Sequence, residues 1–197
     1  FGALGVTAGL SVLETMLLSL VMFSGASQFA FVGVIATGGI AAIPTAIASA
    51  WLLGVRNGFY ALRMAPVLGM PGIAKLLSAQ LTIDESTAVA SAQENPQQER
   101  RGFWWTGVSV FFFWNLMTLA GALLGDQMGN PANYGLDSAA AAAFLGLVWP
   151  RLNSNLYRII GLSAFVIAIA TSAFVPAGVP VLLGAAVAAA IQLWGKK

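Results

Sequence analysis

From Thr15 to Val55 the chain contains no charged residue, and this run limits the possible folds more than any other feature. A single helix of that length would extend about 60 Å, twice the roughly 30 Å thickness of the hydrocarbon core of a bilayer. The run is therefore too long for one crossing and must turn back. Two places offer a turn: the small polar segment Ser24–Gln28, and the glycine pair that follows Thr37.

The composition identifies lipid as the solvent of most of the chain. Charged residues make up 8% of the sequence and hydrophobic residues 58%, whereas soluble domains carry roughly 25% charged residues. The net charge of +2 comes from scattered basic residues, which argues against binding of nucleic acid. The chain has no Cys and no His, so disulfides, His-ligated metals and imidazole proton relays are excluded, and no cofactor is expected. Any proton chemistry must use carboxylates.

The segment pattern predicts one all-α domain over residues 1–197, a polytopic membrane helix bundle with interrupted helices. We expect six or seven membrane segments plus an N-terminal remnant, Phe1–Leu10, which resembles the tail of a helix that begins earlier. The other expected segments are a turn region at Arg56–Gly72, an amphipathic helix at Ile73–Ala92, a polar loop at 94–102, an aromatic-rich span at Gly102–Gly125, a loop at Asp126–Asp137, a short helix at Ser138–Trp149, and two helices within Ile159–Gly195 separated at Pro176–Pro180.

The distribution of basic residues predicts a cytoplasmic C-terminus. The regions 94–102, 151–158 and the C-terminal end are basic, and those at 126–137 and 176–180 are not. This alternation fails at 56–75. Either the segment Ile73–Ala92 does not cross fully, or Arg56 and Arg63 are buried functional or structural charges.

The segment FSGASQFA, within the charge-free run, is the first candidate binding element. A helix can be interrupted in a membrane only where protein or a water-filled cavity satisfies the freed backbone. The free N–H groups at such a break suit a substrate carboxylate, and the free carbonyls suit an ammonium group. Ser24, Gly25, Ala26, Ser27 and Gln28 are therefore candidate binding residues for an amino-acid zwitterion. The alternative is a tight helix crossing, since small residues also allow close helix packing.

Two adjacent acids, Asp84 and Glu85, are candidates for proton coupling. Carboxylates in a low-dielectric environment can bind and release protons near neutral pH, as a coupled transporter requires. A structural alternative exists, because Thr82 and Glu85 have the spacing of a capping box at a helix start. Ser11 and Glu14 have the same spacing, and there we expect only a cap.

Arg56 and Asn57 follow the third apolar segment and are the remaining candidate binding residues. Arg56 could bind a carboxylate or pair with Asp84 or Glu85. It could equally anchor the chain at the membrane interface.

Polar groups also occur inside the aromatic span. They belong to Trp114, Asn115 and Thr118, of which Asn115 and Thr118 lie three residues apart on one helix face. We expect these groups to form hydrogen bonds between helices rather than line a cavity. Phe103, Trp104 and Trp105 are expected in an aromatic belt at the interface.

The segments FSGASQFA, VRNGFYALRMAP, LTIDEST and GLDSAAAAAFLGLVWP together resemble, in order and spacing, the large subunit of branched-chain amino acid exporters, the AzlC family. The resemblance covers most of the chain. It implies export of valine, leucine, isoleucine and, as a fourth candidate, methionine, driven by the proton gradient across the bacterial cytoplasmic membrane. It also implies a small membrane partner of the AzlD type. Many relatives have a histidine where this chain has Asn57, so an imidazole cannot be essential to coupling here.

Two other functions are compatible with the sequence. A membrane-embedded aspartyl protease could use Asp126 and Asp137, although both lie in an expected loop. A scaffold subunit that does not itself transport would tolerate mutation of Gln28, whereas an exporter would not.

Overall fold

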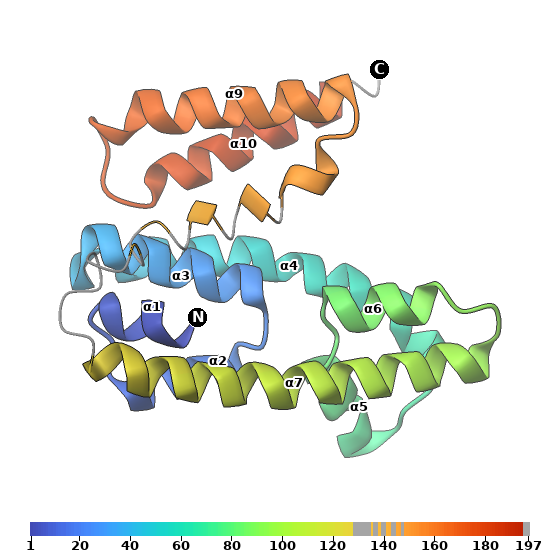
Figure 1. The fold of residues 1–197 in the computed structure, drawn as a ribbon. Coiled ribbons are helices and arrows are strands. Elements are labelled where there is room, and N and C mark those ends of the chain that lie inside the picture. Colours follow the sequence, from blue (N-terminus) through green and yellow to red (C-terminus); the bar gives the residue numbers. More distant parts are fainter. Residues whose placement is uncertain (128–134, 136–137, 139–140, 143–144, 147, 195–197) are drawn as a thin grey trace.

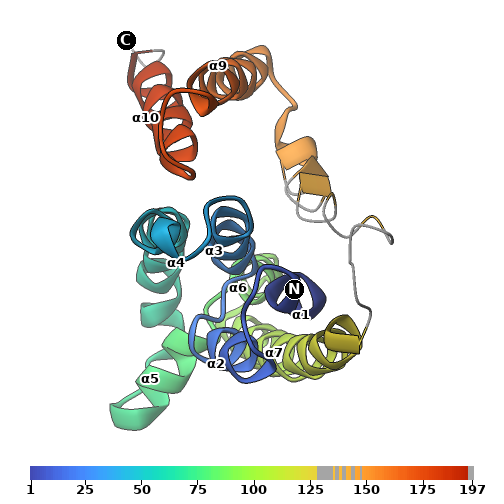
Figure 2. The same cartoon turned by 90° about the vertical axis from the view of Figure 1, so that its left-hand side faces the viewer.

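In the computed structural model every regular element is a helix within the described residues, which are 1–127, 135, 138, 141, 142, 145, 146 and 148–194. The expectation of an all-α chain is thus confirmed for that part. Helices α1 (Gly2–Thr7), α2 (Val12–Val21) and α7 (Pro96–Gln127) form one layer, and α3 (Gly25–Gly38) and α4 (Ile43–Leu68) form the next (Figures 1 and 2). The hairpin of α9 (Asn155–Ser172) and α10 (Val179–Trp194) lies beyond α3 and α4.

Three described helices are long and apolar enough to cross a membrane: Ile40–Leu68, Pro96–Gly125 and Asn155–Ser172. Three shorter apolar helices are α2, α3 and α10. These lengths support a membrane protein with interrupted helices. The split between α9 and α10 confirms the expected turn near Pro176–Pro180. The expected loop at Asp126–Asp137 falls largely outside the described residues, and residues 126 and 127 belong to α7 instead. Within the expected helix at Ser138–Trp149, the described residues 138, 141, 142, 145, 146 and 148 are helical.

The first long apolar run breaks where the small polar segment predicted it. Helix α2 ends at Val21, residues 22–24 are not helical, and α3 begins at Gly25. Ser11 and Glu14 form the expected capping box at the start of α2. Helix α3 ends at Gly38, and Gly39 adopts a φ of 61° that other residues rarely take. The second expected turn is therefore confirmed as well.

The expected turn region at Arg56–Gly72 was wrong, because α4 continues through it to Leu68. Both arginines in this stretch form ion pairs: the partly exposed Arg56 with Asp84, and Arg63, which is 50% exposed, with Glu99. Pro66 lies in the last turn of the helix, where it removes one backbone hydrogen bond shortly before the helix ends. The helix ends where Gly69 adopts a left-handed conformation.

The expected continuous helix at Ile73–Ala92 was also wrong. The segment forms two short helices, α5 (Gly72–Gln80) and α6 (Asp84–Ser91), separated by residues 81–83. Neither is long enough to span, since eight or nine residues extend only about 12 to 14 Å. The break is stabilised locally: Ser86 Oγ accepts a hydrogen bond from Ile83 N and donates one to the Leu81 carbonyl. The chain therefore contains a second interrupted helix.

The expected polar loop at 94–102 is mostly the beginning of α7, which starts at Pro96. Asn95 caps the helix, because its Oδ1 accepts a hydrogen bond from Gln98 N at 2.9 Å. Pro at the first helical position and Glu99 in the first turn are helix-start signals. The stretch was expected to be a loop because it is polar, although it contains these helix-start signals. Arg100 Nε then donates to the Val67 carbonyl at 2.6 Å, which ties this end of α7 to the end of α4.

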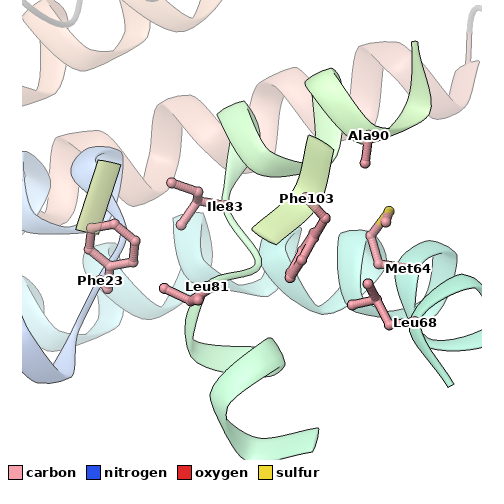
Figure 3. Close-up of a cluster of buried hydrophobic side chains, with 7 residues drawn as sticks. All are labelled: Phe23, Met64, Leu68, Leu81, Ile83, Ala90 and Phe103. Atoms are coloured by element: carbon pink, nitrogen blue, oxygen red, sulfur yellow. The ribbon is translucent and has the colours of Figure 1, made fainter. Parts of the chain in front are cut away.

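A buried apolar cluster joins the two breaks (Figure 3). Phe23 comes from the first break, and Leu81 and Ile83 come from the second. Phe103, which we expected in an aromatic belt, is fully buried in this cluster; of the three aromatic residues, Trp105 is the exposed one, at 76%. The remaining members of the cluster are Met64, Leu68 and Ala90. The two interruptions thus share one core.

Candidate functional site

A cavity of about 280 Å³ lies where the two breaks meet, and we call it cavity 1. It is close to the lower end of the size range of small-molecule sites, roughly 300 to 1,000 Å³. The predicted candidates that line it are Ser24, Gly25, Ala26, Arg56, Asn57, Asp84 and Glu85. These residues come from α3, α4 and α6, far apart in the sequence. The structure therefore brings most of the predicted site residues together.

Cavity 1 has an apolar side as well as a polar one. Phe23, Phe29, Ile83 and Val110 contribute to its wall. Trp114, from α7, completes this side with its ring. Sequence reasoning had placed Trp114 among residues that bond between helices, and it missed the other four because they resemble ordinary core residues.

The start of α3 lies at the cavity. Ser24 is the N-cap residue, but its side chain makes no capping hydrogen bond, and the first turn holds no acidic residue. The first N–H groups of a helix have no partner within the helix, and the helix dipole adds positive potential there. Gly25 and Ala26, the first two residues of α3, both line the cavity. A carboxylate in the cavity would therefore be stabilised by this helix end.

Opposite charges face each other across the junction of α4 and α6. The Arg56 Nη2 and Asp84 Oδ2 atoms are 2.9 Å apart, and both side chains are partly exposed, at 30% and 28%. The Arg56 guanidinium also lies 5.7 Å from the centre of the Tyr60 ring. The pairing that we considered for Arg56 is therefore present. Arg56 is not free to bind a substrate carboxylate unless this ion pair loosens.

Glu85 is exposed beside this ion pair and lines the same cavity. The capping box that we considered for Glu85 is not formed: Ile83 is the N-cap residue of α6, and Thr82 donates to the Ser78 carbonyl instead. Asp84 and Glu85 remain in the first turn of α6, where the helix dipole favours negative charge. Their carboxyl groups make this side of cavity 1 acidic.

The carbonyl groups freed at the end of α2 already have partners. Gln28 Nε2 donates to the Met22 carbonyl at 2.8 Å, and Gln80 Nε2 donates to the Leu20 carbonyl at 2.7 Å. An ammonium group is therefore better served by the acids of α6 than by these carbonyls, contrary to the expectation from the break alone. The role of Gln80 was missed, although an amide one residue from the second break was a visible signal.

Gln28 is fully buried and does not line cavity 1. Besides its bond to the Met22 carbonyl, its Oε1 accepts a hydrogen bond from Trp114 Nε1 at 2.8 Å. Gln28 thus connects the end of α2, the start of α3 and the middle of α7. The structure places it as a support of the break, behind the cavity wall. The helix-to-helix bond expected of Thr118 is also present, since its Oγ1 accepts from Ser19 Oγ at 3.3 Å. The bond of Asn115 lies instead within α7, where its Nδ2 donates to the Phe111 carbonyl at 2.8 Å.

Four polar atoms among the residues of cavity 1 are buried without a hydrogen-bond partner. They are Ser24 Oγ, Arg56 Nε, Asn57 Oδ1 and Asp84 Oδ1. Leaving a buried polar group unpaired costs about 1 to 3 kcal/mol, so such groups usually meet water or a ligand. Their concentration at one cavity suits a small polar molecule.

The structure does not place the carboxyl groups of the two aspartates of the protease alternative. Asp137 lies outside the described residues, and the side chain of Asp126, near the end of α7, is likewise not described.

The family model described as "AzlC protein" matches residues 1–128 of the chain. The match includes both interrupted helices and every polar residue that we assign to cavity 1. Searches of curated proteins and of solved structures gave no significant match.

Proposed function

The chain belongs to the AzlC family, and on this premise we propose that it is the large subunit of an exporter of branched-chain amino acids. The family is associated with membrane transport rather than with an enzymatic activity. The observation that carries the proposal is cavity 1, where two interrupted helices meet and an anion-binding helix start faces a pair of acids. In transporters, interrupted helices of this kind commonly hold the substrate.

A zwitterion with an aliphatic side chain fits the distribution of groups around cavity 1. Its carboxylate would lie at the start of α3, near Ser24 and Gly25, and its ammonium group near Asp84 and Glu85. The aliphatic part would face the apolar wall that includes Phe23 and other ring or branched side chains. One methylene is worth about 1 to 3 kcal/mol in an apolar pocket. Valine, leucine, isoleucine and methionine should therefore compete for the same site.

Proton antiport is the coupling mechanism that we propose. Protonation of Asp84 would weaken its ion pair with Arg56, which lies at 2.9 Å in the structure. The freed guanidinium could then contribute to carboxylate binding, with Asn57 beside it on the same wall. Glu85 would exchange protons with the aqueous side because it is exposed. We further propose a small AzlD-type partner subunit, a location in the bacterial cytoplasmic membrane and a cytoplasmic C-terminus.

Transport in proteoliposomes tests both the substrate and the coupling. The chain is reconstituted with the AzlD-type subunit, and valine movement is measured with and without an imposed pH gradient. We expect the gradient to accelerate the wild type, and Asp84→Asn to abolish that acceleration because it removes the titratable partner of Arg56. Glu99→Gln is the matched control, since Glu99 pairs with Arg63 away from cavity 1.

Two results would contradict the proposal. If the wild type moves no branched-chain amino acid, the substrate assignment is wrong. If Asp84→Asn and Glu85→Gln both respond to the gradient as the wild type does, the carboxylates take no part in coupling.

A further inference from the structure

A second cavity, of about 540 Å³, adjoins cavity 1, and we call it cavity 2. The two cavities have Phe23, Ser24 and Asn57 in common. The rest of cavity 2 is formed by other parts of the chain, chiefly α2 and the stretch of α4 before and after Asn57. The two cavities therefore share two residues of the first break, Phe23 and Ser24, and one residue of α4, Asn57.

Cavity 2 combines buried, unpaired polar atoms with a largely apolar wall. Ser27 Oγ has no hydrogen-bond partner although the residue is only 1% exposed. Ser24 Oγ and Asn57 Oδ1, on the shared boundary, are also buried and unpaired. Apolar walls with a few polar groups are typical of small-molecule sites. The same polar groups could thus contact one small molecule from either side.

The boundary itself is suited to opening. Phe23 lies in the non-helical stretch between α2 and α3, and its ring packs edge-on against Phe111 with centres 4.9 Å apart. A side chain on unwound backbone can move without breaking helical hydrogen bonds. Rotation of this ring would therefore join the two cavities while both flanking helices stay intact.

We propose that cavity 2 is a second subsite for the same aliphatic zwitterion, which the substrate enters from cavity 1 when Phe23 moves aside. Ser24 and Asn57 contact the polar end of the substrate on both sides of the boundary, and Ser27 contacts the same end of the substrate in cavity 2. This inference rests on the proposed function, because it assigns a second position to the substrate of cavity 1.

Gly58 offers a way to fill cavity 2 and leave cavity 1 unchanged. It lines cavity 2 but not cavity 1, and a Cβ built on it meets no atom within 4 Å. Gly58 is exposed, so Gly58→Leu adds a side chain at the wall of cavity 2 from a regular part of α4 without a clash. Gly33→Leu, on α3, is the matched control, since its Cβ also meets nothing and it lines neither cavity.

Equilibrium leucine binding and leucine transport are measured for both variants with the partner subunit present. For Gly58→Leu we expect binding within about twofold of the wild type and transport reduced at least about tenfold, because the substrate still enters cavity 1 but cannot leave through cavity 2. Gly33→Leu should match the wild type in both. A transport rate for Gly58→Leu equal to that of the control would overturn the second subsite, as would a joint loss of binding and transport in a folded protein.

If Gly58→Leu does not fold, Gly58→Cys replaces it, because the chain has no other cysteine. The folded protein is treated with a benzyl thiosulfonate reagent, and Gly33→Cys is treated in parallel. Inhibition of Gly58→Cys alone supports the proposal, and equal transport by both treated proteins overturns it. A wild type that binds no leucine would instead refute the proposed function, so the two failures are distinguishable.

Discussion

At the scale of single residues, the structure separates the side chains that line cavity 1 from those that support it. Gln28 was a candidate binding residue from sequence, since it belongs to the small polar segment at the break. In the structure its amide is shared between the Met22 carbonyl and the Trp114 indole. The sequence could locate the break. It could not show that Gln28 supports the break instead of lining the cavity, because only the fold brings Trp114, 86 positions away, to Gln28.

Gln28→Ala should destabilise the protein more than removal of a typical exposed amide. The change leaves Trp114 Nε1 without this partner and removes one of two hydrogen bonds to the Met22 carbonyl, which also accepts from Ser24 N, at a cost of about 1 to 3 kcal/mol for the one unpaired group. For a chain of this length that corresponds to a melting temperature lower by about 2 to 12 °C, measured in detergent. Trp114→Phe should cost less, because it removes one donor only. Gln93→Ala is the control, since Gln93 bonds only within its own helix end. A melting temperature for Gln28→Ala equal to that of Gln93→Ala would show that Gln28 does not support the break.

At the scale of elements, two interrupted helices rather than one define the site. The first was predictable, because a run of small polar residues stands out in an apolar segment. The second was hidden, since Leu81, Thr82 and Ile83 resemble part of an amphipathic helix. There the hydroxyl of Ser86 bonds to the backbone of Leu81 and Ile83, the first and last residues of the gap, and stabilises the interruption. Such local side-chain competition with the helix is not visible in hydrophobic periodicity.

Gly107 on α7 packs closely against Leu81 and so holds the second break in position. A Cβ at Gly107 would lie 3.0 Å from Leu81 Cβ and 3.3 Å from the Leu81 carbonyl oxygen. Gly107→Leu should therefore displace residues 81–83 and the acids that follow them, and leucine transport should fall at least about tenfold. Val108→Leu, at a position 51% exposed on the same helix, should transport normally. Equal transport by the two variants would mean that the position of this break does not matter.

At the scale of the whole molecule, composition and charge-free runs correctly predicted a helical membrane protein, and breakers such as Pro176 separated α9 from α10. The limits of α4 and α7 were mispredicted for one physical reason. Charged residues were interpreted as boundaries, yet Arg63 and Glu99 pair with each other, and Arg100 caps the end of α4. Charges that neutralise one another within the fold carry no information about where a helix ends.

The central claim is that a branched-chain amino acid binds where the two breaks meet, against Ser24 at the start of α3. The most direct measurement uses Ser24→Cys, the sole cysteine in the chain, and follows its reaction with a small thiol reagent with and without leucine. Leucine at about ten times its dissociation constant should slow the reaction about tenfold by mass action, whereas Ser91→Cys, exposed at the far end of α6, should react at an unchanged rate. Equal reaction rates of Ser24→Cys with and without saturating leucine, in a protein that transports leucine, would contradict the claim.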